Sequence, residues 1–263
     1  MAVIGFFDSG VGGLTVMYEA MKQMPEDQFI YYADTDHVPY GIRTSEEIYC
    51  FTRRAMDFLM DKGAEILVIA CNTATSVAIA RLREELNIPI VGMEPAIKPA
   101  VIRYPEHKIL VCATPMTIEG DKLHRLLESE HASSDNVDLL PLPDLVKWAE
   151  QGIFDPKTIV PYLWEKIQSQ NYTAVVLGCT HFTLFRDSFR QLLGDRIIFI
   201  DGTTGTVNRI KTLANEIPTA AEPQTAAKVR YFQSGREVKD KDTLTFIQNI
   251  YNRQTILDEY IKI

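Results

Sequence analysis

Two short segments of this chain, residues 66–73 and 174–181, follow the same pattern. Each begins with an apolar run rich in β-branched residues, continues with a small residue, and ends with a cysteine and hydrogen-bonding side chains. An apolar run without polar alternation is typical of a strand buried on both faces of a parallel sheet. Ligands of such sheets bind beyond the carboxyl ends of the strands, which is where Cys71 and Cys179 fall. Two thiols presented in equivalent places suggest chemistry with two matching faces.

The similarity between the two halves extends to the neighbouring strands. The distance along the chain from Asp8 to Cys71 is 63 positions, and from Thr114 to Cys179 it is 65. A further strand end follows the two cysteines after 23 and 22 positions. Three strand ends in the same order and at nearly the same spacing indicate a structural duplication, with two copies of a domain rather than a solenoid. The other paired segments are 3–10 with 108–115 and 88–94 with 196–201.

Helical patterns lie between the predicted strands. Residues 45–62 begin with the serine and glutamate of a capping box and carry apolar residues at helical spacing. Residues 75–86 and 182–193 follow the two cysteine strands directly. Strands that alternate with helices indicate βαβ units, a parallel sheet and right-handed crossovers. A last strand is expected at 229–232 and a last helix at 242–251.

We therefore expect an α/β fold of two pseudo-symmetric, Rossmann-like domains with mainly parallel sheets, and an active site in the cleft between them. The first domain is predicted to comprise residues 1–96 together with residues 210–263, and the second domain residues 97–209. A chain of 263 residues is long enough for one large or two medium domains with an ample core.

Composition narrows the range of partners. The formal net charge of −8 and the lack of a basic stripe argue against a nucleic-acid surface. No basic leader precedes the first strand, and no apolar run approaches the length that spans a membrane. Four cysteines without dense spacing do not form a disulfide framework. We expect a cytoplasmic protein with reduced thiols, and neither nucleic acid nor membrane as a partner.

Among the four cysteines, Cys71 and Cys179 are the candidates for chemistry. Cys50 lies within a predicted helix and Cys112 within a predicted strand, and both are expected to pack as small apolar side chains. Cys71 and Cys179 instead stand at strand ends with matched polar neighbours, where a helix begins. The partial positive charge at a helix N-terminus favours a thiolate there.

A thiol at a strand end needs a partner that manages its proton. His181 follows Cys179 by two residues, and histidine titrates near neutral pH. No histidine follows Cys71, but Asp8 ends the neighbouring strand, and a carboxylate there could play the corresponding part. The structural alternatives are a solvated loop position for His181 and an N-cap role for Asp8.

Residues 10–15 are rich in glycine but do not form a nucleotide-binding motif. The dinucleotide fingerprint requires glycine where Thr15 stands, and a P-loop requires a lysine that this segment lacks. Asp8 at the same turn would also repel a pyrophosphate. The glycines could still direct backbone N–H groups at a smaller anion such as a carboxylate. The two cysteines and His181 lack the ligand-pair spacing of a zinc site, so we expect neither a metal nor another cofactor.

Uncharged hydrogen-bonding side chains gather at the predicted strand ends. Each alone is as consistent with a helix cap as with a ligand contact, but together they would surround a small, very polar molecule. Tyr40, in the turn at 39–41 after Asp34, is equally consistent with packing and with ligand contact. The group comprises Ser9, Asn72, Thr73, Thr114, Thr117 and Thr180.

At these residues the chain resembles the cofactor-independent glutamate racemases of the aspartate/glutamate racemase family. The matching motifs stand in family order over most of the chain. Two departures concern local packing more than proton transfer: Phe182-Thr183 stands where the family usually has Tyr-Pro, and Ala113 where a glycine is usual. The motifs are Asp-Ser-Gly-Val-Gly-Gly-Leu-Thr at 8–15, Pro-Tyr-Gly at 39–41, Ala-Cys-Asn-Thr-Ala at 70–74 and Leu-Gly-Cys-Thr-His at 177–181.

The resemblance implies that the chain racemises glutamate without a cofactor, using two thiols on opposite sides of one α-carbon. It implies that Cys71, assisted by Asp8, takes the proton from D-glutamate. It likewise implies that Cys179, assisted by His181, takes the proton from L-glutamate. Glu150 stands where some family members place a further carboxylate that assists the second thiol. The D-glutamate would supply peptidoglycan synthesis, and a homodimer is the expected assembly.

The resemblance also implies a substrate-holding set of side chains. The α-proton of an amino acid is a far weaker acid than a thiol, whose pKa is about 8.5. The site must therefore be closed, dry and rich in oriented donors that stabilise the developing carbanion. The set comprises Asp8, Ser9, Tyr40, Gly41, Asn72, Thr73, Thr114, Thr117, Thr180 and His181.

Three other functions stay open on the sequence alone. A racemase for aspartate or another amino acid on the same scaffold would differ only in pocket details that the motifs do not encode. A non-catalytic protein that binds small anions would keep the cleft but would not need both thiols. A thiol hydrolase needs one nucleophile and an oxyanion hole, and it would leave the second cysteine unexplained.

Overall fold

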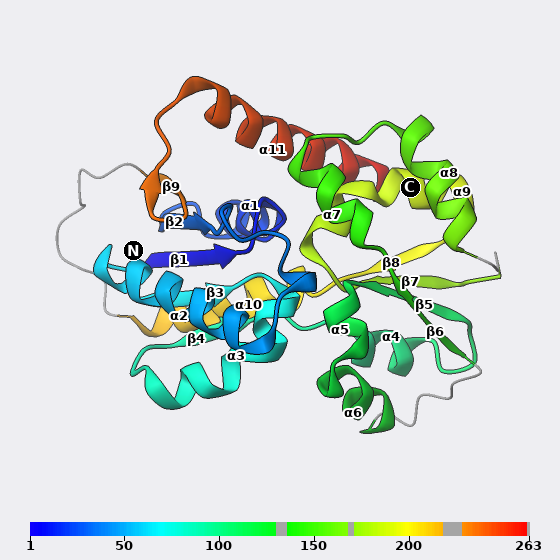
Figure 1. Cartoon of the computed structure of the whole chain (residues 1–263), viewed down its shortest axis with the longest axis horizontal. Helices are drawn as coiled ribbons and strands as arrows, with labels where there is room; N and C mark the ends of the chain where they lie inside the picture. The colour runs from blue at the N-terminus through cyan, green and yellow to red at the C-terminus, as the bar shows by residue number, and fades with distance from the viewer. Residues whose placement is uncertain (130–135, 168–170, 218–227, 262–263) are drawn as a thin grey trace.

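The chain forms two β-sheets, each accompanied by helices (Figure 1). The computed structural model describes residues 1–129, 136–167, 171–217 and 228–261. The first sheet has the strand order β10-β9-β2-β1-β3-β4, and the second has the order β6-β5-β7-β8. The strands are β1 Val3–Asp8, β2 Gln28–Ala33, β3 Ile66–Ile69, β4 Ile90–Gly92, β5 Ile109–Ala113, β6 Val137–Pro141, β7 Ala174–Leu177, β8 Ile198–Ile200, β9 Val229–Gln233 and β10 Arg236–Glu237.

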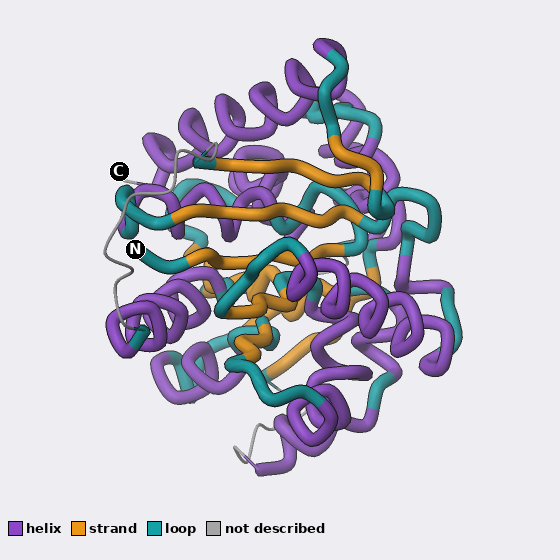
Figure 2. The backbone as a smooth tube through the Cα atoms, turned by 90° about the vertical axis from the view of Figure 1, so that its left-hand side faces the viewer, coloured by secondary structure: helices purple, strands orange, loops and turns teal. Residues whose placement is uncertain are grey.

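Helices connect the strands and surround the first sheet in the view of Figure 2. Two short 3-10 segments, η1 at Tyr40–Ile42 and η2 at Thr180–Phe185, follow β2 and β7 in the chain. The α-helices are α1 Leu14–Gln23, α2 Ser45–Asp61, α3 Asn72–Glu85, α4 Ile97–Arg103, α5 Pro115–Glu119, α6 Asp121–Ser129, α7 Pro143–Glu150, α8 Pro156–Lys166, α9 Arg186–Leu193, α10 Thr203–Glu216 and α11 Lys241–Ile261.

The two sheets repeat one topology. The segment β2-β1-β3-β4 of the first sheet and the whole second sheet, β6-β5-β7-β8, have the same order of strands. Every neighbouring pair in these two segments is parallel, and β10 pairs antiparallel with β9 at one edge. The predicted α/β fold with two related, mainly parallel sheets is confirmed. The duplication places the ends of β3 and β7, and hence both cysteines, at equivalent positions.

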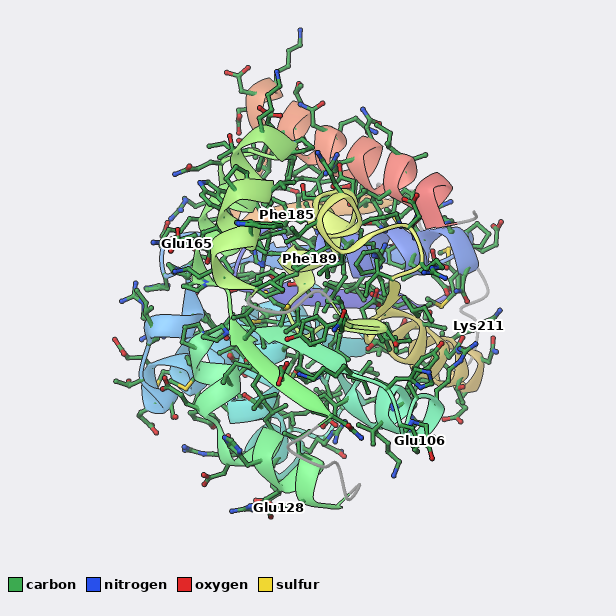
Figure 3. The ribbon with its side chains drawn as sticks, turned by 90° about the vertical axis from the view of Figure 1, so that its right-hand side faces the viewer. Glu106, Glu128, Glu165, Phe185, Phe189 and Lys211 are labelled. Carbon is green, nitrogen blue, oxygen red and sulfur yellow. The ribbon has the colours of Figure 1, made fainter. Side chains whose placement is uncertain are left out.

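The strands that carry the cysteines lie in the interior. All residues of β3 and all residues of β7 are buried, as their continuous apolar runs predict. The largest cluster of buried apolar side chains contains residues of both sheets, including Ile4 and Val175. Phe185 and Phe189 belong to the same cluster, whereas Glu165 lies at the surface (Figure 3). The two halves therefore share part of one core.

Local sequence signals explain where α2 begins. The Thr44 side chain accepts a hydrogen bond from the Glu47 backbone N–H, and the Glu47 carboxylate accepts one from the Thr44 backbone N–H. The capping box predicted near Ser45 is present, but its N-cap is Thr44, one residue earlier. The reciprocal bonds satisfy two N–H groups that a helix start would otherwise leave unpaired.

The position of α10 bears on the division into domains. This helix, Thr203–Glu216, contacts α1, β3 and β4 of the first half, although it follows the last strand of the second sheet. The predicted boundary between residues 209 and 210 falls inside it. Because a single packed helix is not divided between two cores, we propose that the second domain ends before Thr203. The first domain then comprises residues 1–96 and the tail from Thr203 onward.

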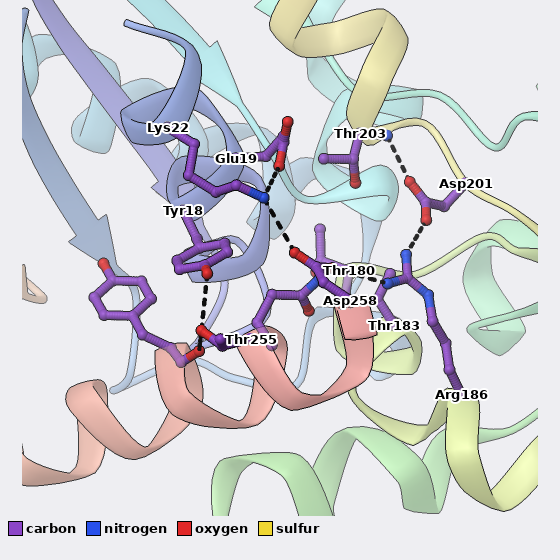
Figure 4. Close-up of polar contacts among 12 residues, drawn as sticks. Tyr18, Glu19, Lys22, Thr180, Thr183, Arg186, Asp201, Thr203, Thr255 and Asp258 are labelled. Carbon is purple, nitrogen blue, oxygen red and sulfur yellow. Dashed lines mark hydrogen bonds and ion pairs between the residues drawn. The ribbon is translucent and has the colours of Figure 1, made fainter. Parts of the chain in front are cut away.

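The last helix, α11, lies across both halves (Figure 1). Asp258 of α11 forms an ion pair of 3.2 Å with Lys22 of α1 and a longer one of 4.0 Å with Arg186 of α9. Arg186 also pairs with Asp201 in the connection that leads to α10 (Figure 4). The tail therefore connects the two halves through charged side chains. Within the described ranges, every helix is too short or too polar to span a lipid bilayer.

Candidate active site

A cavity of 280 Å³ contains both of the cysteines at the repeated strand ends. The first half contributes η1 and the ends of β1 and β3, and the second half contributes the ends of β5 and β7 and one face of α7. This volume lies near the lower end of ligand pockets, about 300–1,000 Å³, and suits a small molecule. The lining residues are Ser9, Pro39, Tyr40, Gly41, Ile42, Cys71, Asn72, Thr73, Thr114, Pro115, Pro143, Val146, Lys147, Cys179, Thr180 and His181.

The first thiol site consists of Cys71, Ser9 and Asp8. Cys71 caps the N-terminus of α3, and its Sγ accepts a hydrogen bond of 3.5 Å from the Ala74 backbone N–H. The thiol donates a hydrogen bond of 3.7 Å to the Ser9 hydroxyl. Burial, followed by the charge of nearby Asp8, raises the pKa of Cys71 to about 12. The sulfur in this site is therefore a thiol at neutral pH.

Asp8 is a fully buried carboxyl group at the end of β1. Its Oδ2 accepts a hydrogen bond of 2.9 Å from the Gly10 backbone N–H, and its Oδ1 accepts one of 3.2 Å from the Thr180 hydroxyl. Burial raises the pKa of Asp8 from 3.8 to about 6, against the opposing effects of His181 and of the Gly10 N–H. Two donors are fewer than a buried carboxylate needs for full compensation, which explains the direction of the change.

The second thiol site consists of Cys179, His181 and Glu150. Cys179 follows β7 and precedes η2, and its Sγ lies 3.6 Å from Nδ1 of His181. The other ring nitrogen of His181, Nε2, lies 2.6 Å from Oε1 of Glu150. Burial by itself lowers the pKa of His181, but hydrogen bonds with Cys179 and Glu150 outweigh burial and raise it well above 6.5. The imidazolium therefore lies between a sulfur and a carboxylate.

The glycine-rich turn makes room for the second thiol site. A Cβ atom built on Gly10 would lie 1.8 Å from Oε1 of Glu150, and one built on Gly12 would lie 2.3 Å from the Thr180 hydroxyl. Residues larger than glycine would therefore push these side chains away. Glycine at these positions therefore allows the two halves of the molecule to approach each other closely.

The backbone N–H groups of this turn do point at carboxylates, but at those of the protein itself. The Gly10 N–H donates to Asp8, and the Val11 N–H donates to Oε1 of Glu150 at 2.8 Å. The expectation that the turn could present these donors to a bound anion is therefore wrong for these two groups. Their role is to hold the carboxylates of both thiol sites.

Three threonine hydroxyls form a triangle beside the cavity. Oγ1 of Thr73 lies 3.0 Å from Oγ1 of Thr114 and 3.2 Å from Oγ1 of Thr117, and the latter two lie 3.0 Å apart. Asn72 donates a hydrogen bond of 3.3 Å to the Met93 carbonyl, while its buried Oδ1 has no partner within the structure. An unpaired buried oxygen in a cavity wall is suited to accept a hydrogen bond from a ligand.

The structure brings most of the predicted site residues together around the cavity. Ten of them line it, whereas Asp8, Thr117 and Glu150 lie behind the lining. Six lining residues were not predicted. Three of them lie on α7 and stand three, four and seven residues before Glu150, which is the spacing of one helix face. This spacing in the sequence could have identified them. The six are Pro39, Ile42, Pro115, Pro143, Val146 and Lys147.

The structure distinguishes between the structural and the functional interpretations of His181, Asp8 and Tyr40. His181 is 2% exposed, so the alternative of a solvated loop position is wrong. Asp8 does not cap α1, whose N-cap is Gly13. Tyr40 both packs against Phe7, with ring centroids 6.1 Å apart, and lines the cavity. Among the residues that the structure describes, no three histidine, cysteine or acidic side chains converge as a metal site would require.

Comparisons with known proteins agree with this geometry. The model of the Asp/Glu/Hydantoin racemase family matches residues 13–210. The chain is 46% identical over 237 residues to a glutamate racemase of Halothermothrix orenii, with 89% of this chain and 93% of the relative covered.

Solved structures of similar proteins share the fold over nearly the whole chain. A glutamate racemase of Campylobacter jejuni is 28% identical, with a TM-score of 0.74 and coverage of 97% of this chain and 98% of that one. An Escherichia coli glutamate racemase in complex with L-glutamate and the activator UDP-MurNAc-Ala is 25% identical, with a TM-score of 0.80 and coverage of 96% and 95%. The resemblance seen in the motifs is confirmed, and the chain belongs to the Asp/Glu/Hydantoin racemase family.

Proposed function

We propose that this protein is a glutamate racemase that interconverts L- and D-glutamate with two cysteine side chains. The observation that carries the proposal is that one small cavity holds two thiols, Cys71 and Cys179, from equivalent strand ends of the two halves. Racemisation is a reaction that uses such an arrangement, because the proton leaves one face of the α-carbon and arrives on the other. The curated glutamate racemases among its relatives support the choice of substrate.

In the proposed mechanism one cysteine acts as a thiolate and the other as a thiol. The thiolate takes the α-proton and becomes a thiol, while the electron pair of the C–H bond stays on the α-carbon. The opposite thiol then gives its proton to that carbon and becomes a thiolate. By family analogy Cys71 is the base for D-glutamate and Cys179 the base for L-glutamate. After one turnover the two sulfurs have exchanged protonation states.

His181 is proposed to stabilise the thiolate form of Cys179. An imidazolium 3.6 Å from the sulfur favours the charged form, as in other cysteine–histidine pairs. Glu150 in turn holds the histidine from its other nitrogen and favours its protonated state. Glu150 is thus proposed as a positioning residue for His181.

Asp8 is proposed to assist Cys71 in a different way. A carboxylate beside a thiol opposes thiolate formation, so Asp8 cannot help while it stays ionised. With a pKa of about 6 it can accept the proton that Cys71 releases, and the resulting neutral carboxyl group no longer repels the sulfur. The ammonium group of a bound amino acid would further favour the thiolate.

The remaining polar side chains of the cavity are proposed to hold the substrate. Asn72 offers an unpaired oxygen, and Thr73 and Thr114 offer hydroxyls from the threonine triangle. Such donors and acceptors, held rigidly in a largely buried site, stabilise the negative charge that develops next to the α-carboxylate. Asp8 and Thr117 lie behind the lining and are proposed to act through Thr180 and Thr73, which they contact. The proposed substrate-holding set is Asp8, Ser9, Tyr40, Gly41, Asn72, Thr73, Thr114, Thr117, Thr180 and His181.

We further propose that the reaction needs neither a metal nor pyridoxal phosphate, because two thiols supply both the base and the acid. Activity that survives exhaustive treatment with a chelator and with a carbonyl-trapping reagent would support this. Activity that disappears and returns on adding a metal or pyridoxal phosphate would contradict it. We also propose that the protein acts in the cytoplasm, that it forms a homodimer, and that its D-glutamate supplies peptidoglycan synthesis.

The deciding experiment uses both enantiomers of glutamate and of aspartate. Circular dichroism should show the signal of L-glutamate and of D-glutamate decaying to zero, and the solvent deuterium of D₂O should enter the α-position. Faster racemisation of aspartate would favour the alternative substrate. Binding of glutamate without any loss of optical activity would instead favour a non-catalytic binding protein.

A further inference from the structure

Asp34, which follows β2 directly, carries a buried carboxylate outside both thiol sites. The Tyr40 hydroxyl donates a hydrogen bond of 2.6 Å to its Oδ2, and the Ser234 hydroxyl donates one of 3.0 Å to its Oδ1. Nδ1 of His37 lies 2.9 and 3.0 Å from the two oxygens. Three side chains therefore converge on a single buried carboxyl group, whose burial would be unfavourable without these hydrogen-bond partners.

Tyr40 connects this carboxylate to the cavity. The side chain is 1% exposed, lines the cavity, and packs against Phe7 and Phe51 with ring centroids about 6 Å away. Packing restricts the ring, and the bond to Asp34 fixes the hydroxyl. The next residue, Gly41, faces the second half so closely that an added Cβ would lie 3.0 Å from Cβ of Thr114. A shift of η1 would therefore change the width of the cavity.

Ser234 connects the same carboxylate to the tail of the chain. This residue stands between β9 and β10, and its backbone N–H donates a hydrogen bond of 2.8 Å to the Ala33 carbonyl. Its hydroxyl donates to Asp34 and accepts a hydrogen bond of 3.0 Å from the Asp36 backbone N–H. The turn between these strands thus holds the loop that leads from β2 to η1.

We propose that Asp34 is a positioning residue for the substrate cavity. It holds Tyr40 and η1 in place and connects them, through Ser234, to the β9–β10 turn almost two hundred residues away in the sequence. The inference rests on the proposed racemase function. Because Asp34 contacts neither thiol site and acts through Tyr40, it contributes to substrate binding far more than to proton transfer.

The test is a kinetic comparison of Asp34→Asn with the wild-type protein. An amide has the shape of a carboxylate but carries no negative charge and has a single accepting oxygen, so at least one of the three contacts must weaken or reverse its direction. We expect KM to rise about tenfold for both enantiomers, with kcat lowered less than about threefold and the α-deuterium isotope effect on kcat unchanged. Ser234→Ala should raise KM about twofold to threefold, since one of the three partners is removed.

Two controls separate positioning from loss of stability. Thr52→Val removes a buried hydroxyl that donates a hydrogen bond of 2.7 Å to the Ile48 carbonyl in the same half but away from the cavity. It should lower Tm and leave KM unchanged. In a Tyr40→Phe background, Asp34→Asn should raise KM by less than about twofold, because the contact through which it acts is already gone.

The outcomes distinguish this inference from the proposed function. If the wild-type protein racemises glutamate but Asp34→Asn keeps the wild-type KM, or shifts it no more than Thr52→Val does, the inference is overturned. An equal effect of Asp34→Asn with and without the Tyr40 hydroxyl would also overturn it. If Asp34→Asn does not fold, Ser234→Ala and its combination with Tyr40→Phe give the same comparison. A wild-type protein without racemase activity would instead contradict the proposed function.

Discussion

The two thiol sites occupy equivalent strand ends, yet the charge beside the sulfur differs. Next to Cys71 lies the carboxyl group of Asp8, which together with burial raises the pKa of the thiol to about 12. Next to Cys179 lies the ring of His181, whose positive charge is favoured by Glu150. In the protein without substrate, the first sulfur is therefore held as a thiol, while the second has a cationic partner.

This difference suggests how a symmetric reaction can run on an asymmetric site. The proposed mechanism needs one thiol and one thiolate at the start of each turnover, and the opposite partners of the two sulfurs distinguish the two sites before the substrate arrives. The two sites are also connected, because the Thr180 hydroxyl donates to Asp8 and lies 3.5 Å from Nδ1 of His181. A change of charge in one site therefore changes the pKa values in the other, and Asp8 and His181 titrate as a coupled pair.

The largest effect is expected from the sulfurs themselves. Cys71→Ser and Cys179→Ser should each lower racemisation by about four powers of ten or more, because one face then lacks its acid or base. Circular dichroism of either enantiomer measures the loss. A single variant should still exchange the α-proton of one enantiomer in D₂O. Cys50→Ser, which changes a thiol outside the cavity, should leave the rate unchanged. Near-normal rates of Cys71→Ser in both directions would refute the two-thiol mechanism.

Substitutions of the partners of the sulfurs should give the next largest effects, and each should affect mainly one direction of the racemisation reaction. Asp8→Asn should mainly lower kcat with D-glutamate, and His181→Asn should mainly lower kcat with L-glutamate. The reason is that each of these two side chains helps its own thiol to act as the base. Losses of about two to four powers of ten fit the removal of general acid–base assistance.

The equilibrium constant fixes the ratio of kcat/KM in the two directions. The asymmetry must therefore be sought in kcat and in isotope effects with α-deuterated enantiomers. Small and equal effects of both variants in both directions would assign Asp8 and His181 to binding or structure.

Asp8→Asn should also change how stability depends on pH. A rise of the pKa from 3.8 to about 6 favours the protonated carboxyl group in the folded state, so the wild-type protein loses stability as the pH rises through this range. The variant does not titrate. Its free energy of unfolding relative to wild type should therefore increase by about 2 kcal/mol between pH 4 and pH 7, since one pKa unit corresponds to about 1.4 kcal/mol and the unfolded carboxyl group is already partly ionised at pH 4.

Urea denaturation at several pH values measures this difference. Any hydrogen bond that asparagine loses shifts all pH values equally and does not affect the slope. Asp57→Asn, on the exposed side of α2, is the control variant. A difference that stays constant with pH would mean that Asp8 is ionised as easily in the folded as in the unfolded chain.

The smallest of these effects is expected from Glu150→Gln. The amide keeps a hydrogen bond to His181 but removes the charge that raises the pKa of the ring. The imidazolium should then be lost at lower pH. We expect kcat with L-glutamate to fall about tenfold at neutral pH, and the alkaline limb of its pH profile to move to lower pH.

Gly10→Ala offers an independent way to disturb the same contact. The added Cβ would lie 1.8 Å from Oε1 of Glu150, so the carboxylate must move away from His181. The variant should reproduce the altered pH profile, whereas Gly205→Ala, where a Cβ meets no neighbour, should not. An unchanged profile in both Glu150→Gln and Gly10→Ala would show that Glu150 does not control the charge of His181.

Much of the fold follows from short-range patterns in the sequence. The apolar runs before Cys71 and Cys179 predict strands buried on both faces, and the nearly equal spacing of these cysteines from Asp8 and Thr114 predicts two copies of one topology. Both features are present, because period and spacing follow from the geometry of parallel sheets with helical crossovers. The proposed end of the second domain before Thr203 rests on tertiary contacts instead, since α10 packs on β3 and β4, which are distant in sequence.

Within the site, the sequence predicts the chemical groups but not the contacts between them. The motifs point to Cys71, Cys179, Asp8 and His181, because thiols and titratable groups at strand ends have few structural explanations. The close approach of Glu150 to the Gly10 turn could not be predicted, since the two residues lie 140 positions apart and meet only when the halves pack together.

The charge beside each sulfur depends on the same packing. Burial raises the pKa of Asp8, and hydrogen bonds to Cys179 and Glu150 raise that of His181. Burial and hydrogen-bond partners are properties of the assembled molecule, because they depend on which distant segments exclude water from a group. The residue types and their order along the chain therefore specify the reaction class, while the packing of the two halves decides which titratable group lies beside each sulfur and how strongly that group holds its proton.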